Sequence, residues 1–202
     1  MLIILTSERA IENEAELINL LFSEGLERLH LRKPEFSING YRGLLDQIKA
    51  QYYDRIMLHE HHELLQEYSL RGIHLQEQAR LDLGDALEVT LKVYENKGLK
   101  VSSSFHSKED IVKCMGHFEY VLLSPVFGSI SKAGYKGKGF DVTDLDEYVI
   151  GMGGINENTL QAACDLGFKG VGVLGGVWNS GDVIESFKII YDKLMQVKKS
   201  LT

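Results

Sequence analysis

Residues 148–155 read YVIGMGGI, an apolar run that contains three glycines and passes directly into the polar segment 156–159, NENT. Glycine loses more conformational freedom on folding than any other residue, so glycines gathered at a strand end indicate that something approaches the backbone closely. An apolar strand that leads into a helix start is one half of a βα unit. How often this unit recurs along the chain decides the fold.

Short apolar runs alternate with amphipathic segments along the whole sequence. The runs that we expect to be strands cover residues 2–6, 26–32, 55–59, 72–75, 99–104, 120–126, 148–154 and 170–176. Most are apolar at consecutive positions, as parallel strands covered by helices must be. Eight such units in 202 residues predict a small α/β protein of the (βα)8 TIM-barrel type. An open flavodoxin-like or Rossmann sheet of roughly five or six strands would leave two units unexplained.

The connection after the sixth expected strand differs from the others. Between Phe140 and Tyr148 only the seven residues DVTDLDE remain, so we expect the sixth helix to be a single turn or absent. No proline-rich or serine-rich linker interrupts the chain. Residues 1–202 are therefore expected to form a single TIM-barrel domain with a shortened sixth helix.

Composition and charge narrow the class of protein. With 44% hydrophobic and 25% charged residues, the composition is that of an ordinary globular domain. The net charge of −7 argues against nucleic-acid binding by general attraction to phosphates, so any anion site has to be built locally. No apolar run approaches the roughly 18 residues that cross a bilayer, and the N-terminal MLIILTSERA lacks the features of a secretion signal. We expect a cytoplasmic protein without nucleic-acid or membrane partners, and homo-oligomerisation stays open.

Two glycine pairs follow the last two expected strands. Gly153 and Gly154 end the seventh run, and Gly175 and Gly176 end the eighth, each just before a helix start. In a parallel barrel the loops that follow the strands meet at one face, where backbone N–H groups and helix N-termini attract anions. The two pairs therefore predict a phosphate site, with tight turns and close packing as the structural alternative.

The segment 124–139, SPVFGSISKAGYKGKG, is a second candidate anion site. Ser129, Ser131 and Lys132 carry donors that suit phosphate or pyrophosphate oxygens, on a glycine-rich loop that can close over a ligand. A solvated basic loop fits the composition equally well. Arg32 favours the anion site, because an arginine in the apolar run LHLRKP is expected to point into the barrel mouth and to need an anionic partner.

Three histidines lie on or at the ends of expected strands. His30 lies on the second strand, His59 ends the third and His74 lies on the fourth. Imidazole titrates near neutral pH, so His30 and His74 are candidate general bases, with a hydrogen-bonded core histidine as the equal alternative, and His59 is a candidate for lining the pocket. His61 and His62 follow His59 without the i, i+4 spacing of the HExxH metal motif, so we interpret them as a solvated helix start.

Taken together and in this order, the segments LHLRKP, GIHL, SxH, SPVFxSxSK, GMGGI and GVGVLGG resemble the thiamine phosphate synthase and TenI superfamily over essentially the whole chain. The resemblance implies a TIM-barrel enzyme of thiamine biosynthesis that binds small-molecule phosphates. In the synthases, a pyrimidine diphosphate loses pyrophosphate with the help of Mg²⁺, and the thiazole phosphate nitrogen captures the carbocation. TenI-type enzymes isomerise a thiazole carboxylate phosphate with a general base and no metal cofactor.

The same resemblance assigns roles to individual residues. Arg32 corresponds to an arginine on the family's second strand, and Ser104 corresponds to a serine that precedes a histidine after the fifth strand. Ser129, Ser131 and Lys132 stand for the threonine, threonine and lysine of the family's strand-six loop. The phosphate of the thiazole would be held by Gly153, Gly154, Gly175 and Gly176.

The sequence departs from the synthases where they bind Mg²⁺. The family's Asn-Asp after the third strand is His59-Glu60 here, and its Gly-Gln-x-Asp after the fourth strand is Gln76-Glu-Gln-Ala79. Mg²⁺ prefers carboxylate oxygens in tight geometry, which leaves Glu60 and, as a substitute, Glu77 as the metal candidates. We therefore expect a synthase-like transferase in which condensation with the pyrimidine diphosphate is weak or absent.

The sequence departs from TenI proteins as well. Their catalytic histidine lies in the strand-six motif, where this chain has Pro125, so His30, His59 or His74 would have to replace it. A TenI-like tautomerase without a pyrophosphate site and a non-catalytic sensor of a phosphate ligand are the alternatives to the synthase. An unrelated phosphate-binding isomerase or epimerase would need paired acid and base groups across the mouth, and paired carboxylates of that kind are hard to find at these strand ends.

Overall fold

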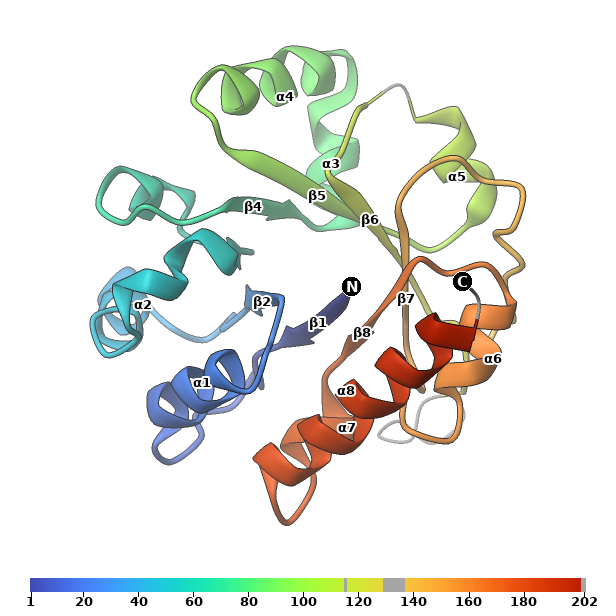
Figure 1. Ribbon diagram of the computed structural model, residues 1–202. Coiled ribbons are helices and arrows are strands. Elements are labelled where there is room, and N and C mark those ends of the chain that lie inside the picture. Colours follow the sequence, from blue (N-terminus) through green and yellow to red (C-terminus); the bar gives the residue numbers. More distant parts are fainter. Residues whose placement is uncertain (115, 129–136, 201–202) are drawn as a thin grey trace.

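The computed structural model describes residues 1–114, 116–128 and 137–200. Its parallel strands form a closed barrel in chain order, in which the last strand pairs with the first (Figure 1). The strands are β1 (Leu2–Leu5), β2 (Arg28–Leu31), β3 (Ile56–Leu58), β4 (Gly72–Leu75), β5 (Lys100–Phe105), β6 (Tyr120–Leu123), β7 (Val149–Met152) and β8 (Gly170–Val173). The predicted α/β barrel is confirmed, and each observed strand lies in or beside its predicted run.

Helices surround the barrel on the outside (Figure 1). They are α1 (Glu14–Ser23), α2 (Ile38–Leu45), α3 (Glu77–Leu83), α4 (Leu87–Asn96), α5 (Lys108–Lys113), α6 (Leu160–Asp165), α7 (Gly175–Trp178) and α8 (Val183–Ser200). Two of them begin at serine caps: the Ser37 hydroxyl accepts from the Gly40 N–H, and the Ser107 hydroxyl accepts from the Asp110 N–H. Such caps satisfy backbone donors that have no partner inside the helix. Within the described chain, no helix is both long and apolar enough to cross a membrane.

Two predicted helical segments differ from the structure. The segment after β3 forms only the short 3-10 helix η2 (His62–Gln66), which His61 enters with a left-handed φ of 55°. The segment before β5 is broken into α3, the 3-10 turn η3 (Gly84–Ala86) and α4, with Gly84 at a φ of 47°. A further 3-10 helix, η1 (Ala50–Arg55), precedes β3. Between β6 and β7, residues 124–128 and 137–148 contain no helix. This agrees with the prediction that the helix after the sixth strand is a single turn or absent.

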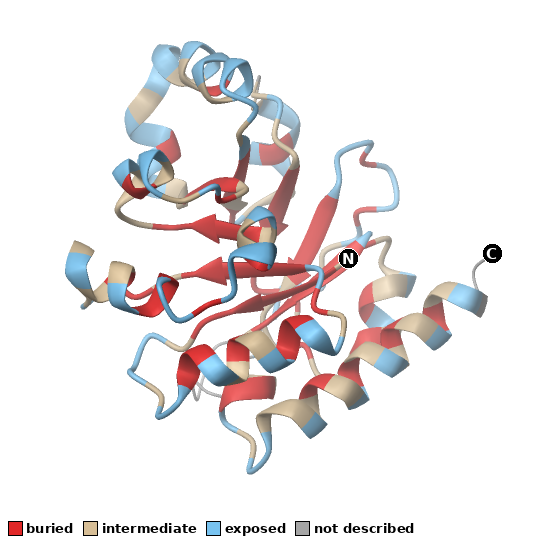
Figure 2. Ribbon diagram, turned by 60° about the vertical axis from the view of Figure 1, so that its left-hand side comes forward, coloured by how far each residue is buried: buried red, intermediate tan, exposed pale blue. Residues whose placement is uncertain are grey.

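The core has two layers because neighbouring residues on a strand point to opposite sides. The outer layer lies between the strands and the helices and includes Leu2, Ile4, Leu29 and Leu31. The inner layer fills the barrel with apolar side chains from several strands, namely Ile3, Leu5, Met57, Tyr120, Leu122 and Ile150. Figure 2 shows strands that are mostly buried, with most of the exposed residues on helices and loops; the exposed strand residue is Lys100, which begins β5.

A buried ion pair joins the loop after β2 to α1. Lys33 is fully buried, and its Nζ lies 2.6 Å from Glu14 Oε2 and donates to the Arg9 carbonyl oxygen at 2.7 Å. Burial raises the pKa of the Glu14 carboxyl, and Lys33 opposes that shift. Lys33 is also held at its backbone, where its N–H donates to the Tyr41 hydroxyl at 2.8 Å.

Candidate functional site at the barrel mouth

Three buried histidines form a cluster just inside the carboxyl ends of the strands. His30 on β2, His59 after β3 and His74 on β4 have ring centroids 4.3 to 5.0 Å apart. His30 and His74 alternate with outward-facing apolar residues, so the two-residue period of a strand turns both rings into the barrel. His30 Nδ1 lies 2.9 Å from His59 Nε2, and His30 Nε2 lies 2.7 Å from the Tyr120 hydroxyl. The structure thus brings together all three histidines that the sequence singled out.

Burial determines the protonation of these rings. It lowers the pKa values of His30 and His59 well below the ordinary value and lowers that of His74 to about 3, with the positive charge of neighbouring groups adding to the effect. All three imidazoles are therefore neutral at pH 7. His59 is 7% exposed, and its Nδ1 is a buried nitrogen without a hydrogen-bond partner. A neutral ring with an unsatisfied nitrogen can accept a proton or bind a cation.

Ser104, a predicted phosphate ligand, lies against this cluster. Its hydroxyl is 2.7 Å from His74 Nε2, and the hydroxyl of Ser102 is 2.8 Å from His74 Nδ1. Both serines lie on β5 with the same inward orientation. Ser104 is only partly buried, so it is the polar group of β5 that reaches the mouth.

Arg32 follows β2 and is fixed by both backbone and side chain. Its N–H donates to the Thr6 hydroxyl at 2.8 Å, and that hydroxyl donates to the Arg32 carbonyl oxygen at 2.9 Å. The guanidinium forms an ion pair with Glu8 and is 27% exposed. The anionic partner that the sequence required for Arg32 is therefore present within the chain itself.

The two acidic metal candidates have different surroundings. Glu60 accepts hydrogen bonds from two neutral donors, the Tyr41 hydroxyl and the Gln76 amide, the latter at 3.1 Å. Glu77 accepts from the backbone N–H of His106 at 3.1 Å, and its other oxygen lies 2.8 Å from His106 Nδ1. Each oxygen of both carboxylates thus has a hydrogen-bond partner, but the donors on Glu60 are neutral, whereas the Arg80 guanidinium lies 3.8 Å from Glu77 Oε1 and opposes a second cation there.

The strand-seven glycines admit backbone from the loop that follows β6. Gly153 and Gly154 have φ values of 96° and 66°, which favour glycine. A Cβ on Gly154 would lie 2.5 Å from the Gly128 carbonyl oxygen, and one on Gly153 would lie 3.0 Å from Pro125 Cα. The Phe127 N–H also donates to the Gly153 carbonyl oxygen at 3.1 Å. Close packing, the structural alternative, accounts for why these two positions need glycine.

The second glycine pair begins the four-residue helix α7. A Cβ on Gly176 would lie 3.2 Å from the Ile155 carbonyl oxygen, so the start of α7 packs closely on the loop after β7. Ser129, Ser131 and Lys132, the predicted ligands of the strand-six loop, lie outside the described residues. Next to them, Lys138 is described and donates from Nζ to the His106 carbonyl oxygen at 2.8 Å.

Replacing Gly154 with alanine is expected to destabilise the protein by about 1–3 kcal/mol, because the new methyl group meets backbone and the residue keeps a left-handed φ. The measurement is urea unfolding monitored by circular dichroism. Gly181→Ala is the matched control, since nothing lies within 4 Å of a Cβ there. Equal stability of the two variants would contradict the packing role of Gly154.

Sequence reasoning missed Tyr120, Ser102 and Tyr41. Tyr120 and Ser102 lie on strands at inward-facing positions, and the register pairs them directly with each other. Tyr120 lies two residues before Leu122, and Ser102 lies two residues before Ser104. The two-residue period of a strand therefore places each pair on the same, inward face, and this pattern could have identified Tyr120 and Ser102. Tyr41 lies on α2 and reaches Glu60 only through the folded arrangement of loops, and no sequence pattern marks it.

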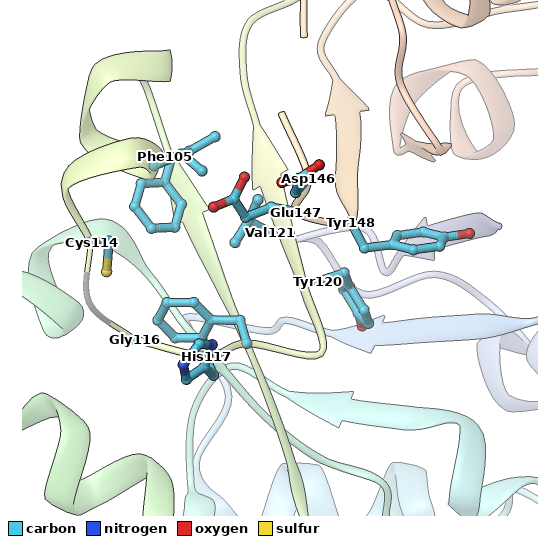
Figure 3. A pocket seen from close by; sticks show the side chains of 11 residues that line it. Phe105, Cys114, Gly116, His117, Tyr120, Val121, Asp146, Glu147 and Tyr148 are labelled. Carbon is cyan, nitrogen blue, oxygen red and sulfur yellow. The ribbon is translucent and has the colours of Figure 1, made fainter. Parts of the chain in front are cut away.

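A separate pocket lies on the outside of the barrel, away from the mouth. It has a volume of about 470 Å³ and is lined from α5, the start of β6 and the segment before β7. Figure 3 shows Phe105, Cys114 and His117 around one part of it and Asp146 and Glu147 around another. It occupies the sector between β6 and β7 where the described chain has no covering helix.

The fold and the mouth define a TIM-barrel protein whose polar groups gather at the carboxyl ends of the strands. The chain is similar to thiamine phosphate pyrophosphorylase from Bacteroides thetaiotaomicron, with 33% identity over 98% of both chains and a TM-score of 0.76. It belongs to the thiamine phosphate synthase and TenI superfamily, as the sequence predicted. No protein-family model and no curated protein matches the sequence.

More distant structures support the fold alone. Thiamine phosphate pyrophosphorylase from Pyrococcus furiosus is 18% identical, with a TM-score of 0.78, and the match covers 97% of this chain and 96% of that one. A 3-hexulose-6-phosphate synthase is 14% identical, with a TM-score of 0.70 and coverage of 95% and 99%. Family membership supports a transferase, and small-molecule phosphates fit the family as substrates.

Proposed function

We propose that the barrel mouth binds a thiazole phosphate and joins it to hydroxymethylpyrimidine diphosphate. In this reaction the bond between the pyrimidine methylene carbon and oxygen breaks, and the electron pair leaves with pyrophosphate. The thiazole nitrogen then donates its lone pair to the methylene carbon, and a carbon–nitrogen bond forms. The observation that carries the proposal is the 33% identity to thiamine phosphate pyrophosphorylase over 98% of both chains.

The thiazole phosphate is assigned to the side of the mouth built by β7 and β8. Gly153, Gly154, Gly175 and Gly176 end these strands, which is where TIM barrels commonly bind phosphate. Ser104 adds a hydroxyl from β5, and Ser129, Ser131 and Lys132 are proposed to contact the diphosphate. Arg32 contributes positive charge at the mouth, where its pairing with Glu8 holds the guanidinium in place.

Glu60 is the residue that would hold Mg²⁺. One carboxylate together with substrate phosphate oxygens is a usual arrangement for this ion, and both donors that contact Glu60 are neutral. When bound, the ion would neutralise charge on the diphosphate oxygens as the leaving group departs. Glu77 is the weaker candidate, because the positively charged Arg80 guanidinium lies 3.8 Å from its Oε1. With one fitting carboxylate, we expect the condensation to be slow.

The test measures thiamine phosphate by its fluorescent oxidation product, with pyrimidine diphosphate, thiazole phosphate and Mg²⁺, and with a metal-free control. Glu60→Gln is expected to lower the metal-dependent rate about 100-fold, as loss of one electrostatic contact to a developing charge commonly does. Glu77→Gln is the matched control and should keep the rate. Absence of product from the unmodified chain, with thiazole phosphate still bound, would exclude the synthase and leave the tautomerase or the sensor.

A second candidate function rests on the unpartnered Nδ1 of His59. A neutral imidazole can remove a proton from a thiazole carboxylate phosphate and return it at another ring position, which gives the aromatic tautomer without a metal. His30 and His74 would hold the His59 ring by hydrogen bonding and stacking. We expect His59→Asn to abolish tautomer formation. Full activity in that variant would exclude His59 as the base.

A further inference from the structure

We propose that His30, His59 and His74 form a binding site for one first-row transition metal ion, represented by Zn²⁺, on the floor of the barrel mouth. Over residues 1–114, 116–128 and 137–200, these histidines are the one group of three or more His, Cys, Asp or Glu side chains whose ligand atoms lie within 4.8 Å of one another. The proposal is independent of the proposed condensation, in which none of these histidines takes part, and it excludes His59 as the base of the tautomerase, because a metal-bound imidazole has no lone pair left for that proton.

The distances suit a shared ion. Zn²⁺ binds imidazole nitrogen at about 2.0–2.1 Å, so two nitrogens of a tetrahedral site lie about 3.3 Å apart. His30 Nδ1 and His59 Nε2 are 2.9 Å apart, slightly closer than that, and the remaining nitrogen pairs of the group are within 4.8 Å. Pairs that start near this limit have to close by about 1.5 Å to reach the spacing of a tetrahedral site.

The two nitrogens of His59 have different surroundings. Its Nε2 lies 2.9 Å from His30 Nδ1, inside the cluster, whereas its buried Nδ1 makes no hydrogen bond. In the three-histidine site the ion takes the place of the proton shared between His30 Nδ1 and His59 Nε2. Nδ1 of His59 then carries the ring proton.

Hydroxyl groups of neighbouring side chains hold the imidazole rings of His30 and His74 in their orientation. The Tyr120 hydroxyl lies 2.7 Å from His30 Nε2, which fixes the ring so that Nδ1 points to the centre of the cluster. Ser102 and Ser104 lie on the two nitrogens of His74 at 2.8 and 2.7 Å, so one of them remains as an orienting partner when the other gives way. Such partners of metal-binding histidines commonly contribute 10–100-fold to affinity, on the order of the values measured for other sites.

The donor set selects the kind of ion. Three neutral imidazoles suit Zn²⁺, Co²⁺, Ni²⁺ or Cu²⁺, whereas Mg²⁺ and Ca²⁺ prefer oxygen. Arg32 and Arg28 oppose a cation here, but Arg32 is paired with Glu8, and Arg28 lies 3.7 Å from Glu119. Because the three ligands carry no charge, we expect the fourth position to take an anion or hydroxide.

The test uses the full chain after treatment with a chelator, titrated with Co²⁺ and then with Zn²⁺. We expect one equivalent of Co²⁺ to give the visible absorption bands of a four-coordinate site, and Zn²⁺ to displace it. His59→Ala and His74→Ala should each weaken binding at least about tenfold. His106→Ala and His117→Ala, which change exposed histidines, are the matched controls and should bind as the unmodified chain does.

Two further measurements cover the case in which a histidine variant fails to fold. Tyr120→Phe keeps the ring in the core and removes the hydroxyl that contacts His30 and Ser102. The variant should therefore fold, but it should bind at least about tenfold more weakly. X-ray absorption of the Zn²⁺-loaded unmodified chain should show scattering from three imidazoles. The proposal is overturned if Co²⁺ gives no such bands, if they persist in His59→Ala, or if imidazole scattering is missing.

Discussion

Replacing Lys33 with methionine is expected to destabilise the protein by about 3–5 kcal/mol, because the change leaves the Glu14 carboxylate buried without its cation. Lys33 is fully buried and the Glu14 side chain is 5% exposed, so water cannot replace the lost partner. The carboxyl avoids part of this cost by taking up a proton, since burial already raises its pKa. The loss should therefore be larger at pH 8 than at pH 5. Urea unfolding at both pH values measures it.

Two variants separate the buried charge from other effects of the substitution. Lys33→Met combined with Glu14→Leu removes both charges and should recover most of the lost stability, because a well-packed apolar pair commonly replaces a buried ion pair at little cost. Lys92→Met breaks the pair with Glu88, which has a similar distance of 2.7 Å but is exposed, and should leave stability unchanged. If Lys33→Met behaves like Lys92→Met, the buried pair does not stabilise the fold.

Acid is expected to destabilise the protein steeply once the pH falls below about 6.5. In the folded chain, burial lowers the pKa of His74 to about 3 and those of His30 and His59 well below 6.5. The unfolded chain takes up protons on the same rings near pH 6.5, so it binds more protons than the folded chain below that pH. Stability is therefore complete above about pH 6.5 and is lost as the pH falls toward the folded pKa values, by about 4 kcal/mol per pH unit for three rings.

The charges that face the rings act in the same direction. The positive charge of Arg28 lowers the pKa of His30 further. The positive charge of Arg32 lowers the pKa values of His59 and His74, and a protonated His62 would lower these two as well. The measurement is urea unfolding between pH 5 and pH 8 with a chelator present, so that no ion is bound to the rings. His74→Asn should reduce the slope by about one third, whereas His106→Asn, an exposed histidine, should not change it. If the pH dependence of the unfolding free energy corresponded to uptake of fewer than about one proton on unfolding, the three rings would not be neutral and buried in the folded chain.

The strands were predictable from the sequence because each is a short apolar run bounded by polar residues. The absence of a helix from the described residues between β6 and β7 was predictable too, since the seven residues DVTDLDE leave no room for more than a single turn. The segment 60–69 was not, because its helical pattern competes with a left-handed residue at His61, which the sequence does not mark. Local pattern thus determined the elements, and tertiary context determined which of them became regular helices.

The candidate site was predictable only as separate residues. His30, His59 and His74 were each candidates, but their assembly depends on strand register, as in the pairing of His74 with Ser102. Tyr120 joins them from 90 residues away from His30. The glycines at 153 and 154 were ambiguous for a physical reason: a phosphate and a neighbouring backbone make the same demand on a strand end, namely the absence of a side chain.

The contacts of Lys33 and Tyr41 have a consequence for the entropy of ligand binding. Lys33 joins the loops after β1 and β2, and the Tyr41 hydroxyl joins Lys33 to Glu60 after β3. Three consecutive loops of the mouth are thus held together by hydrogen bonds within the protein. Because these loops are already ordered, a ligand that binds against them costs little conformational entropy of the protein. Its affinity on this side of the mouth should therefore depend mainly on the contacts between ligand and protein.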